Sequence, residues 1–537
     1  MSKVAESGFG AKAAFQKSKI MDADTAVRAI QSGSTVAFCG AGGGMTEPTL
    51  IINALAKRFN EDSLPRDLTL LHTSGLGNRN DLGMSPLALD GLSRRIIGGH
   101  WGQSPRLAEM AERNEIEAYN FPQGIMAQLF RCAAAHQPGL ITNIGLGTFL
   151  DPRQQGGRLN ERTTEELIRL MEVDGKEWLF YPALAPDVAV IRGTTADTDG
   201  YISMEDEISY LDCLQMAQAA HNNNGLVIAQ VHRLVKPGTL HPKSIRIPGF
   251  MVDVIVVDPD QKQLYTTGLD RYISGDFVKE TLEREFLALN ERKVVARRAL
   301  MELKPGDVGN VGVGIPDGIG LVAQEEGLAD SFTLTVEHGT CGGTSLQGIF
   351  FGASINMRAM LDMPAQFDFY HGGGLDVAFL SFAEVDQVGN VNVHKFNGKI
   401  MGTGGFVDIC QNTRKIIFMG TLSSGGLKVE IGEGRLEVVK DGRFQKFVPF
   451  LDEITFNASN AFSQGQEILY VTERAVFKLA ATGVELTEIA PGIDLERDLA
   501  SRMGFRPAVS PNLKLMDSRL FRDESMGIDS EWLGRVG

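Results

Sequence analysis

The sequence predicts an α/β fold made of two homologous domains, each an open, mostly parallel sheet flanked by helices. Short apolar runs, such as 35–38, 226–229 and 252–257, alternate with helix-like stretches, such as 24–30 and 48–59. Strands that are buried on both faces, as in parallel sheets, have continuous apolar runs of this kind. Many of the 61 glycines cluster beside these runs, which is typical of loops at strand ends.

A repeated pattern indicates that the two domains are copies of one fold. Residues 68–72 read Leu-Thr-Leu-Leu-His, and residues 334–338 read Leu-Thr-Val-Glu-His. Further matches keep one constant separation along the chain, which is hard to obtain by chance. The pairs at this separation are Asp187 with Asp376, Asp197 with Asp386, and Gly200 with Gly389.

A charged, helix-like passage between residues 277 and 302 separates the two copies. We place the domain junction near residue 295, which gives an N-terminal domain, 1–295, and a C-terminal domain, 296–537. Two short motifs, Asp174-Gly175 and Asp441-Gly442, predict hairpin turns, so some antiparallel strands should accompany the sheets. The charges of the passage are Glu283, Arg284, Arg292, Lys293, Arg297 and Arg298.

Composition excludes several classes of function. The net charge of −15 argues against a nucleic-acid partner, so a polyanionic ligand would need a local cluster of cations or backbone N–H groups. The five cysteines form no CxxC, and no two of the nine histidines lie within four residues, so we expect neither disulfides nor a metal site. No apolar run is long enough for a membrane span and no signal-type core is present, which favours a cytoplasmic protein without a membrane partner.

Glu337 is the first candidate catalytic residue, because the alignment of the two repeats matches it with Leu71. A carboxylate at a position where the twin strand accepts leucine risks a desolvation cost of several kcal/mol, and a chemical role would explain it. A glycine-rich loop follows at once, so the side chain should lie at the C-terminal edge of the sheet, where open α/β sheets bind ligands. A structural glutamate paired with an arginine is the alternative.

Glycine-rich loops supply further candidates. The segment 402–408, Gly-Thr-Gly-Gly-Phe-Val-Asp, allows a substrate to approach the backbone, and the N–H groups around Gly404 and Gly405 are placed to stabilise an oxyanion. It is not a dinucleotide fingerprint, because Val407 stands where the last glycine is required. A third loop, Gly40–Pro48, has a counterpart at Gly312–Pro316, and both precede helix-like segments that could bind an anion or form a simple turn.

Two familiar enzyme classes drop out. His371-Gly372-Gly373-Gly374 is similar to the oxyanion segment of some α/β-hydrolases, but the chain contains no Gly-x-Ser-x-Gly and so lacks the serine nucleophile. The chain also contains no Walker A sequence.

Taken together, the motifs resemble those of the family I CoA-transferases, in particular the single-chain acetate/propionate type with two fused homologous subunits. The likeness extends over nearly the whole chain. The matching segments are Gly40–Pro48, Pro122–Gly124, Gly147–Phe149 with Asp151–Arg153, Arg246–Gly249, Gly389–Val393, Gly402–Asp408, Tyr470–Phe477 and Ile489–Asp494. In succinate-using relatives the glutamate usually sits in Ser-Glu-Asn-Gly. Val336-Glu337-His338-Gly339 departs from that pattern and suits the monocarboxylate branch.

The resemblance implies a short-chain acyl-CoA:carboxylate CoA-transferase that acts through a glutamyl-CoA thioester on Glu337. Gln123, from the other half, would help Gly404 and Gly405 to stabilise the oxyanion. CoA, a substrate and covalent intermediate with no permanent cofactor, would contact Asn390, Gly402, Gly404, Gly405 and Lys399, with Lys395 or Lys415 as other phosphate partners. Relatives suggest a homodimer or homotetramer. An acyl-CoA hydrolase on the same scaffold and a non-catalytic ligand-binding protein are the alternatives.

Overall fold

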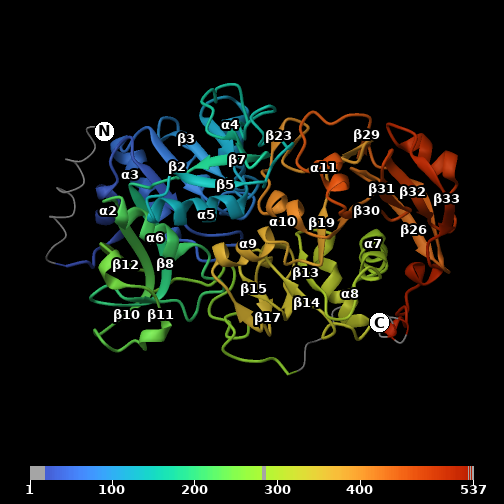
Figure 1. Ribbon diagram of the computed structural model, residues 1–537. Helices are drawn as coiled ribbons and strands as arrows, with labels where there is room; N and C mark the ends of the chain where they lie inside the picture. The colour runs from blue at the N-terminus through green and yellow to red at the C-terminus, as the bar shows by residue number, and fades with distance from the viewer. Residues whose placement is uncertain (1–17, 281–285, 530, 532–533, 535–537) are drawn as a thin grey trace.

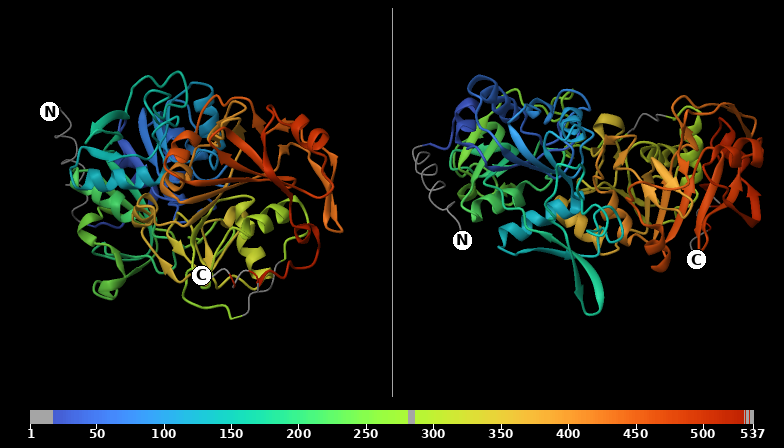
Figure 2. Two further views of the ribbon diagram at one scale, coloured as in Figure 1. Left: turned by 45° about the vertical axis from the view of Figure 1, so that its right-hand side comes forward. Right: turned by 90° about the horizontal axis from the view of Figure 1, so that it is seen from above.

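The computed structural model describes residues 18–280, 286–529, 531 and 534. Its two α/β halves lie side by side, the N-terminal half in blue to green and the C-terminal half in yellow to red (Figure 1). Both further views show the same arrangement (Figure 2). Among the described residues, no helix is long and apolar enough to cross a bilayer.

The N-terminal half is built on a nine-stranded sheet of order β11-β9-β8-β1-β2-β3-β4, with β10 paired to β8 and β12 paired to β10. All of its pairings are parallel except those that involve β9. Its strands are β1 (Thr35–Phe38), β2 (Leu68–His72), β3 (Ser93–Gly98), β4 (Glu117–Asn120), β8 (Val188–Asp197), β9 (Ile202–Ser203), β10 (Leu226–Val235), β11 (Ile245–Ile247) and β12 (Val254–Val257). Its helices are α2 (Ala23–Ala26), α3 (Thr49–Asp62), α4 (Pro105–Glu112), α5 (Gln123–Ala134) and α6 (Cys213–Asn222).

The C-terminal half is built on a ten-stranded sheet of order β18-β15-β14-β13-β19-β24-β30-β31-β32-β33. The strands from β14 to β30 in this order are parallel. The sheet strands are β13 (Val308–Val311), β14 (Thr333–Thr335), β15 (Thr340–Cys341), β18 (Ala359–Met360), β19 (Val377–Ser381), β24 (Lys415–Met419), β30 (Glu467–Val471), β31 (Ala475–Ala480), β32 (Gly483–Ile489) and β33 (Ala508–Leu515). The helices are α7 (Glu291–Leu300), α8 (Ile319–Glu325), α9 (Met363–His371), α10 (Phe406–Asn412) and α11 (Ala458–Ser463).

The two sheets repeat one another in register. In the first, β1 lies between β2 and β8, and Val188 of β8 pairs with Leu226 of β10. In the second, β13 lies between β14 and β19, and Val377 of β19 pairs with Lys415 of β24. These pairs keep the constant separation of the sequence repeat, so the duplicated α/β fold is confirmed there. The match of residues 68–72 with 334–338 is wrong by two residues. Val36 and Gly309 take equivalent places, and their partners are Leu70 and Leu334, so the counterpart of Glu337 is Thr73 and not Leu71.

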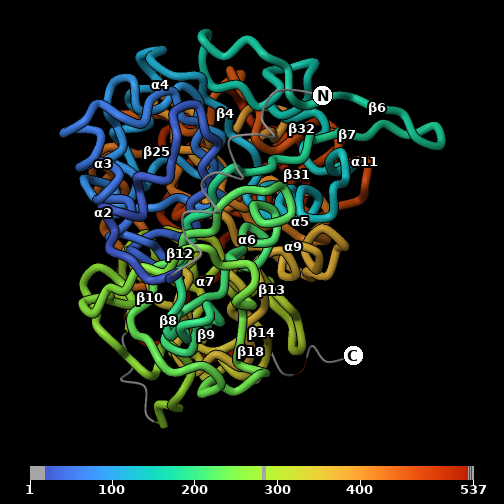
Figure 3. Tube along the Cα trace, turned by 90° about the vertical axis from the view of Figure 1, so that its left-hand side faces the viewer, coloured from blue at the N-terminus to red at the C-terminus, as the bar shows by residue number. Residues whose placement is uncertain are grey.

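Small antiparallel sheets decorate both halves, and one of the two expected hairpin turns is correct. Asp174-Gly175 joins β6 (Arg169–Val173) to β7 (Lys176–Pro182), which pairs with β5 (Gly139–Thr142) and projects from the molecule (Figure 3). Asp441-Gly442 is not a hairpin turn. There β27 (Arg435–Lys440) pairs with β26 (Lys428–Gly432) through Glu433-Gly434, where Glu433 takes a positive φ. The other short strands are β16 (Thr344–Ser345), β17 (Ser354–Ile355), β20 (Glu384–Asp386), β21 (Val391–Asn392), β22 (Lys395–Phe396), β23 (Lys399–Ile400), β25 (Ser423–Ser424), β28 (Phe444–Gln445) and β29 (Phe447–Val448).

The junction region contains a helix, as the charged pattern predicts. Residue 295 lies inside α7, whose buried face packs with α8, β24 and β30 of the C-terminal half. Glu283 and Arg284 belong to residues 281–285, which lie outside the described part of the chain. The boundary at 295 stays a prediction.

Candidate active site

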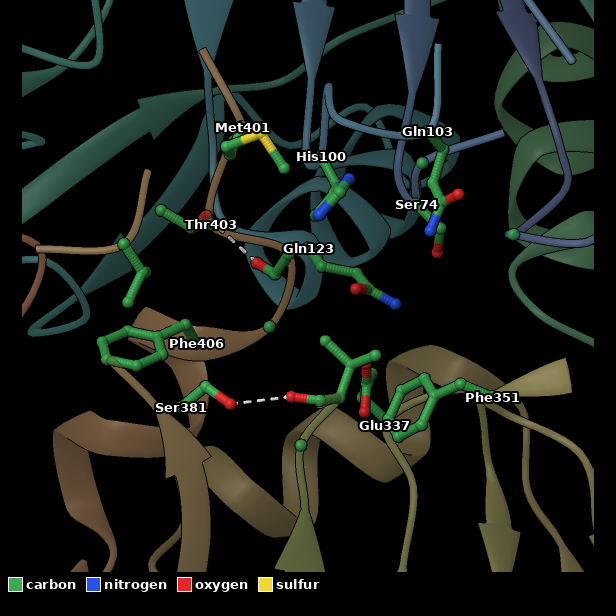
Figure 4. Close-up of a pocket in the computed structure, with 18 of the residues that line it drawn as sticks. Ser74, His100, Gln103, Gln123, Glu337, Phe351, Ser381, Met401, Thr403 and Phe406 are labelled. Atoms are coloured by element: carbon green, nitrogen blue, oxygen red, sulfur yellow. Dashed lines mark hydrogen bonds between the residues drawn. The ribbon is translucent and has the colours of Figure 1, made fainter. Parts of the chain in front are cut away.

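A cavity of about 320 Å³ lies between the two halves, at the C-terminal ends of strands from both sheets. Loops that follow parallel strands converge at this edge, which is why open α/β sheets bind ligands there. Figure 4 shows the side chains of both halves facing the same space. The lining residues that follow a strand are Ser74 after β2, His100 and Gln103 after β3, Gln123 after β4, Gly312 after β13 and Glu337 after β14.

Glu337 projects into this cavity from the turn after β14 (Figure 4). The turn is closed by the Val336 N–H, which donates to the Thr340 carbonyl at 3.0 Å, and by the Gly339 N–H, which donates to the Val336 carbonyl at 3.0 Å. Gly339 has φ +108, and a Cβ there would lie 2.1 Å from the Leu361 carbonyl oxygen, so the turn requires glycine. The carboxylate is therefore aimed by a backbone geometry that few sequences allow.

The Glu337 carboxylate is desolvated and incompletely bonded. Its side chain is half-buried, and within the described residues its Oε2 atom has no hydrogen-bond partner. Burial raises the pKa of Glu337 to about 7. Hydrogen bonds from its own backbone N–H and from the Asn310 amide lower this pKa in part, whereas the charge of Asp408 raises it. No arginine of the described residues forms an ion pair with it, which excludes the structural alternative. A poorly solvated carboxylate in a cavity has the properties of a nucleophile.

The other titratable side chains of the cavity leave Glu337 without a strong cationic neighbour. Burial lowers the pKa of His100 and of His338 to about 4, so both imidazoles are neutral near pH 7. Arg79 is the single Arg or Lys among the described residues that line the cavity, and it is exposed. No cluster of three His, Cys, Asp or Glu side chains suited to a metal occurs in the described ranges.

Gln123 reaches the cavity from the N-terminal half because the start of α5 is held by the other half. The backbone N–H groups of Gly124 and Ile125 donate to the two carboxylate oxygens of Asp408, at 2.9 and 3.2 Å. A carboxylate at a helix N-terminus satisfies free N–H groups and complements the helix dipole. The Gln123 N–H donates to the Gly404 carbonyl at 2.9 Å, so its side chain is set opposite Glu337 (Figure 4).

The loop 402–405 lines the cavity, but one expected role of its backbone needs correction. The Gly404 N–H donates to the Gly99 carbonyl at 2.8 Å, and the Gly402 N–H donates to the His394 carbonyl at 3.0 Å. Gly404 therefore cannot present its N–H to an oxyanion in this arrangement, and it serves instead to fasten the loop to the N-terminal half. The Gly405 N–H, at the N-terminus of α10, has no acceptor within the described residues. Of Gly404 and Gly405, therefore, only Gly405 has an N–H available to an oxyanion.

The structure does not bring Asn390 and Lys399 to the cavity. Asn390 is buried, donates to Asp386 at 2.9 Å and accepts from the Ala458 N–H at 2.9 Å, so its side chain holds a turn together. Lys399 pairs with Glu112 of the N-terminal half at 2.9 Å. The other two lysines are also paired: Lys395 with Glu453 at 2.8 Å, and Lys415 with Glu302 and Glu467.

Sequence reasoning missed several lining side chains, namely Ser74, Arg79, His100, Gln103 and Met401. A signal was available for three of them. Ser74, His100 and Gln103 follow β2 and β3 directly, and the rule that placed Glu337 at a strand end applies equally to the first copy. Arg79 and Met401 lie in irregular segments that strand patterns do not place.

Comparison with known proteins identifies the family. A family model described as Coenzyme A transferase matches residues 20–258. The acetate CoA-transferase YdiF of Escherichia coli (strain K12) is 58% identical over 509 residues, which cover 95% of this chain and 96% of that protein. The chain belongs to the coenzyme A transferase family.

Two further relatives support this assignment and confirm the expected fold and enzyme class. A caffeate CoA-transferase of Acetobacterium woodii is 41% identical, with 95% of this chain and 99% of that protein covered. A crystal structure of the acyl-CoA transferase YdiF of E. coli O157:H7, described as a thioester complex with CoA, superposes with a TM-score of 0.91 at 56% identity and covers 95% of this chain and 97% of that one. These relatives support coenzyme A as the substrate, which becomes part of a covalent thioester intermediate.

Proposed function

We propose that this CoA-transferase moves CoA between short-chain acyl-CoA thioesters and carboxylates, and that Glu337 carries the CoA as a glutamyl thioester. The observation that supports it is the position of Glu337, a desolvated carboxylate with an unpartnered oxygen at the meeting edge of two sheets. The relative whose solved structure is described as a CoA thioester complex shares this architecture over 95% of the chain.

The reaction divides into two symmetrical halves. Ionised Glu337 attacks the thioester carbonyl, which forms an acyl-glutamyl anhydride and expels CoA thiolate. The thiolate then attacks the glutamyl carbonyl, which forms the glutamyl-CoA thioester and releases the first carboxylate. An acceptor carboxylate reverses these steps, so the new acyl-CoA leaves and Glu337 is regenerated as a carboxylate. Covalent catalysis of this kind gives ping-pong kinetics.

Neighbouring groups in the cavity support the two tetrahedral intermediates. The free N–H of Gly405 and the side-chain amide of Gln123 line the same cavity as Glu337, and each can donate to an oxyanion. The Gln123 amide also donates to the Met363 sulfur at 3.2 Å, which leaves its second hydrogen for the substrate. Preorganised donors in a poorly hydrated site stabilise developing charge more strongly than donors in water. Both halves of the chain are required for this arrangement, because Gln123 and Glu337 come from different sheets.

The size and walls of the cavity favour small acyl groups. Phe351, Leu380, Phe382 and Val393 line it, together with the neutral imidazole of His338. An apolar, confined site excludes water, which would hydrolyse the anhydride and the thioester. We include acetate, propionate, butyrate and acetoacetate as candidate carboxylates. The relatives named for acetate and for caffeate indicate that the acyl specificity of the family varies.

Mass spectrometry of the trapped intermediate tests the proposal. Incubation with acetyl-CoA, without an acceptor, should add CoA to the peptide that contains Glu337, and the Glu337→Gln variant should lack the adduct. Cys341→Ser is the matched control, because its thiol lies four residues away and should be irrelevant. An adduct on Cys341, or none on Glu337 in the presence of turnover, would overturn the assignment. Acceptor-independent release of CoA would instead indicate a hydrolase.

We also propose that the protein is a cytoplasmic homodimer or homotetramer, as its resemblance to the family I CoA-transferases implies. Light scattering of the purified protein measures the oligomer directly. A monomer at micromolar concentration would refute this part without touching the chemistry.

A further inference from the structure

A second cavity, of about 690 Å³, adjoins the catalytic one and lies wholly in the C-terminal half. The two cavities share three wall residues, Phe382, Ala383 and Phe396. The catalytic cavity lies between the halves, whereas the second is formed by β20, β25 and β28 with the segment around Arg502. A long ligand that enters the first cavity can therefore continue along the shared aromatic wall into the second.

Lys446 is the cation at the boundary between the two cavities. Its Nζ atom stands 3.9 Å from the centroid of the Phe382 ring, which belongs to both linings. No carboxylate of the described residues forms an ion pair with it. Burial lowers the pKa of Lys446 to about 8, although the charge of Glu473 opposes this. A cation that is partly desolvated and lacks a counter-charge is suited to an anionic ligand.

The packing around Lys446 fixes its position. A Cβ at Gly420 would lie 2.6 Å from the Phe382 ring and 2.8 Å from Lys446 Nζ, so the glycine makes room for both groups. The carbonyl of Lys446 accepts from the Val385 N–H of β20 at 2.7 Å, which ties its backbone to the strand below the cavity. The ammonium is thus held on the shared wall instead of moving freely at the surface.

The charged residues that line the second cavity, Lys446 included, carry an excess of one positive charge: Lys446, Arg443 and Arg502 against Glu384 and Asp441. Arg443 is exposed and has its guanidinium 5.5 Å from the Phe444 ring, and no carboxylate of the described residues pairs with it. Arg502 pairs with Asp441 at 3.1 Å, but Asp441 is already paired with the buried Arg474 at 2.9 Å. In a chain of net charge −15, an excess of this kind beside the active site favours a polyanion.

We propose that Lys446, with Arg443, binds the phosphate groups of the acyl-CoA substrate, while the neutral arm of CoA crosses the wall formed by Phe382 and Phe396. The inference rests on the proposed function, since it assumes that an acyl-CoA occupies the catalytic cavity. It accounts for a feature that the chemistry at Glu337 leaves unexplained, namely an unpaired ammonium on an aromatic ring next to the reacting centre. It also replaces Lys395, Lys399 and Lys415 as the expected phosphate contacts, because each of these lysines forms an ion pair with a glutamate.

Truncated donors provide the test. The Lys446→Met variant should raise KM for acetyl-CoA by about 10- to 100-fold with little change in kcat, because a hydrogen bond to a charged group is lost. With acetyl-pantetheine, which lacks the phosphates, wild type and variant should have the same kcat/KM. Acetyl-dephospho-CoA separates the pyrophosphate from the 3′-phosphate as the group that Lys446 contacts. Equal losses with acetyl-CoA and acetyl-pantetheine, or no loss with either, would overturn the proposal.

Two controls separate charge from folding. Lys446→Arg keeps the cation and should retain most of the affinity, and Lys428→Met removes an exposed lysine from β26 and should change nothing. The thioester adduct at Glu337 should still form in Lys446→Met at high acetyl-CoA concentration. Failure of that adduct in the wild type would refute the proposed function, whereas an unchanged KM in Lys446→Met would refute the phosphate site alone.

A pH profile gives a readout that a purely structural role would not produce. Above about pH 8 Glu337 is already ionised whereas Lys446 loses its proton, so kcat/KM for acetyl-CoA should fall in the wild type and stay level in Lys446→Arg. The charged groups around it are carboxylates and guanidinium groups. They are Glu473 and Arg474 from the turn after β30, Asp441 and Arg443 from the segment after β27, Glu384 from β20, and Arg502.

Discussion

The reaction of the free enzyme with acyl-CoA should accelerate as the pH rises through about 7, because Glu337 attacks only as a carboxylate. Burial raises the pKa of Glu337 to about 7 from its ordinary 4.5. With that pKa the ionised fraction is roughly 10% at pH 6 and 90% at pH 8, so kcat/KM should rise about ninefold over this interval in Lys446→Arg, where no loss of the Lys446 proton offsets the rise, and somewhat less in the wild type. The assay is kcat/KM for acetyl-CoA at each pH with excess acceptor.

A companion variant makes this prediction specific to Glu337. The Asn310 amide lowers the pKa of Glu337, so Asn310→Ala should move the rising limb to higher pH. Loss of packing alone would reduce kcat/KM by the same factor at every pH and leave the limb in place. A wild-type profile that is flat between pH 5 and 8 would refute the reasoning, because it would show a glutamate that is already ionised.

The remaining expectations concern the site and the contacts between the halves. Glu337→Asp should lower turnover on the order of 100-fold, since the attacking oxygen moves by about one bond length, and near-normal kcat in that variant would contradict a nucleophilic role. Glu337→Gln should raise the free energy of unfolding at pH 8 by up to about 3 kcal/mol in chemical denaturation. The folded-state pKa is raised, so this gain should shrink as the pH falls from 7 and vanish below 4.5. Gly402→Ala places a Cβ 2.9 Å from backbone atoms of the N-terminal half and should reduce both activity and melting temperature. Gly398→Ala is the control: its φ is also positive, but open space surrounds it, so it should cost far less activity. Asp408→Asn leaves a helix terminus poorly capped and should cost about 1–3 kcal/mol of stability by thermal melting, while Asp368→Asn, at an exposed pair with an arginine, should cost under about 1 kcal/mol.

The duplicated fold could be predicted because the repeat and the apolar strand runs are both local features. The strands β2 and β14 that the sequence matched occupy equivalent places in the two sheets, but the match of Leu71 with Glu337 is two residues out of register, because similar residues recur along both strands. The hairpin at Asp441-Gly442 could not be predicted correctly, because an Asp-Gly pair favours a turn without determining which strands flank it. Strand partners in that region are set by tertiary packing.

The site was predictable where it follows from strand ends and not where it depends on contacts between the halves. Glu337 and Gln123 come after strands, and the structure brings them to one cavity. Nothing in the order of residues indicates that the Gly404 N–H is used by Gly99, or that Asn390 is used by Asp386. Lys446 escaped notice for the same reason, since an isolated lysine becomes informative only when its partners, or their absence among the described residues, are seen.

The two sheets share strand order and register, so each half presents an equivalent edge to the cavity between them. In the N-terminal copy the strand registers place Thr73 at the position of the nucleophile, and its buried hydroxyl donates to Asp212 at 2.5 Å. Joining the copies in one polypeptide allows them to differ: one edge carries a desolvated, reactive acid, and the other carries a hydroxyl that is already hydrogen-bonded. A split version, co-expressed as two polypeptides, should reassemble through the backbone contacts of Gly402 and Gly404, because those contacts need no covalent link.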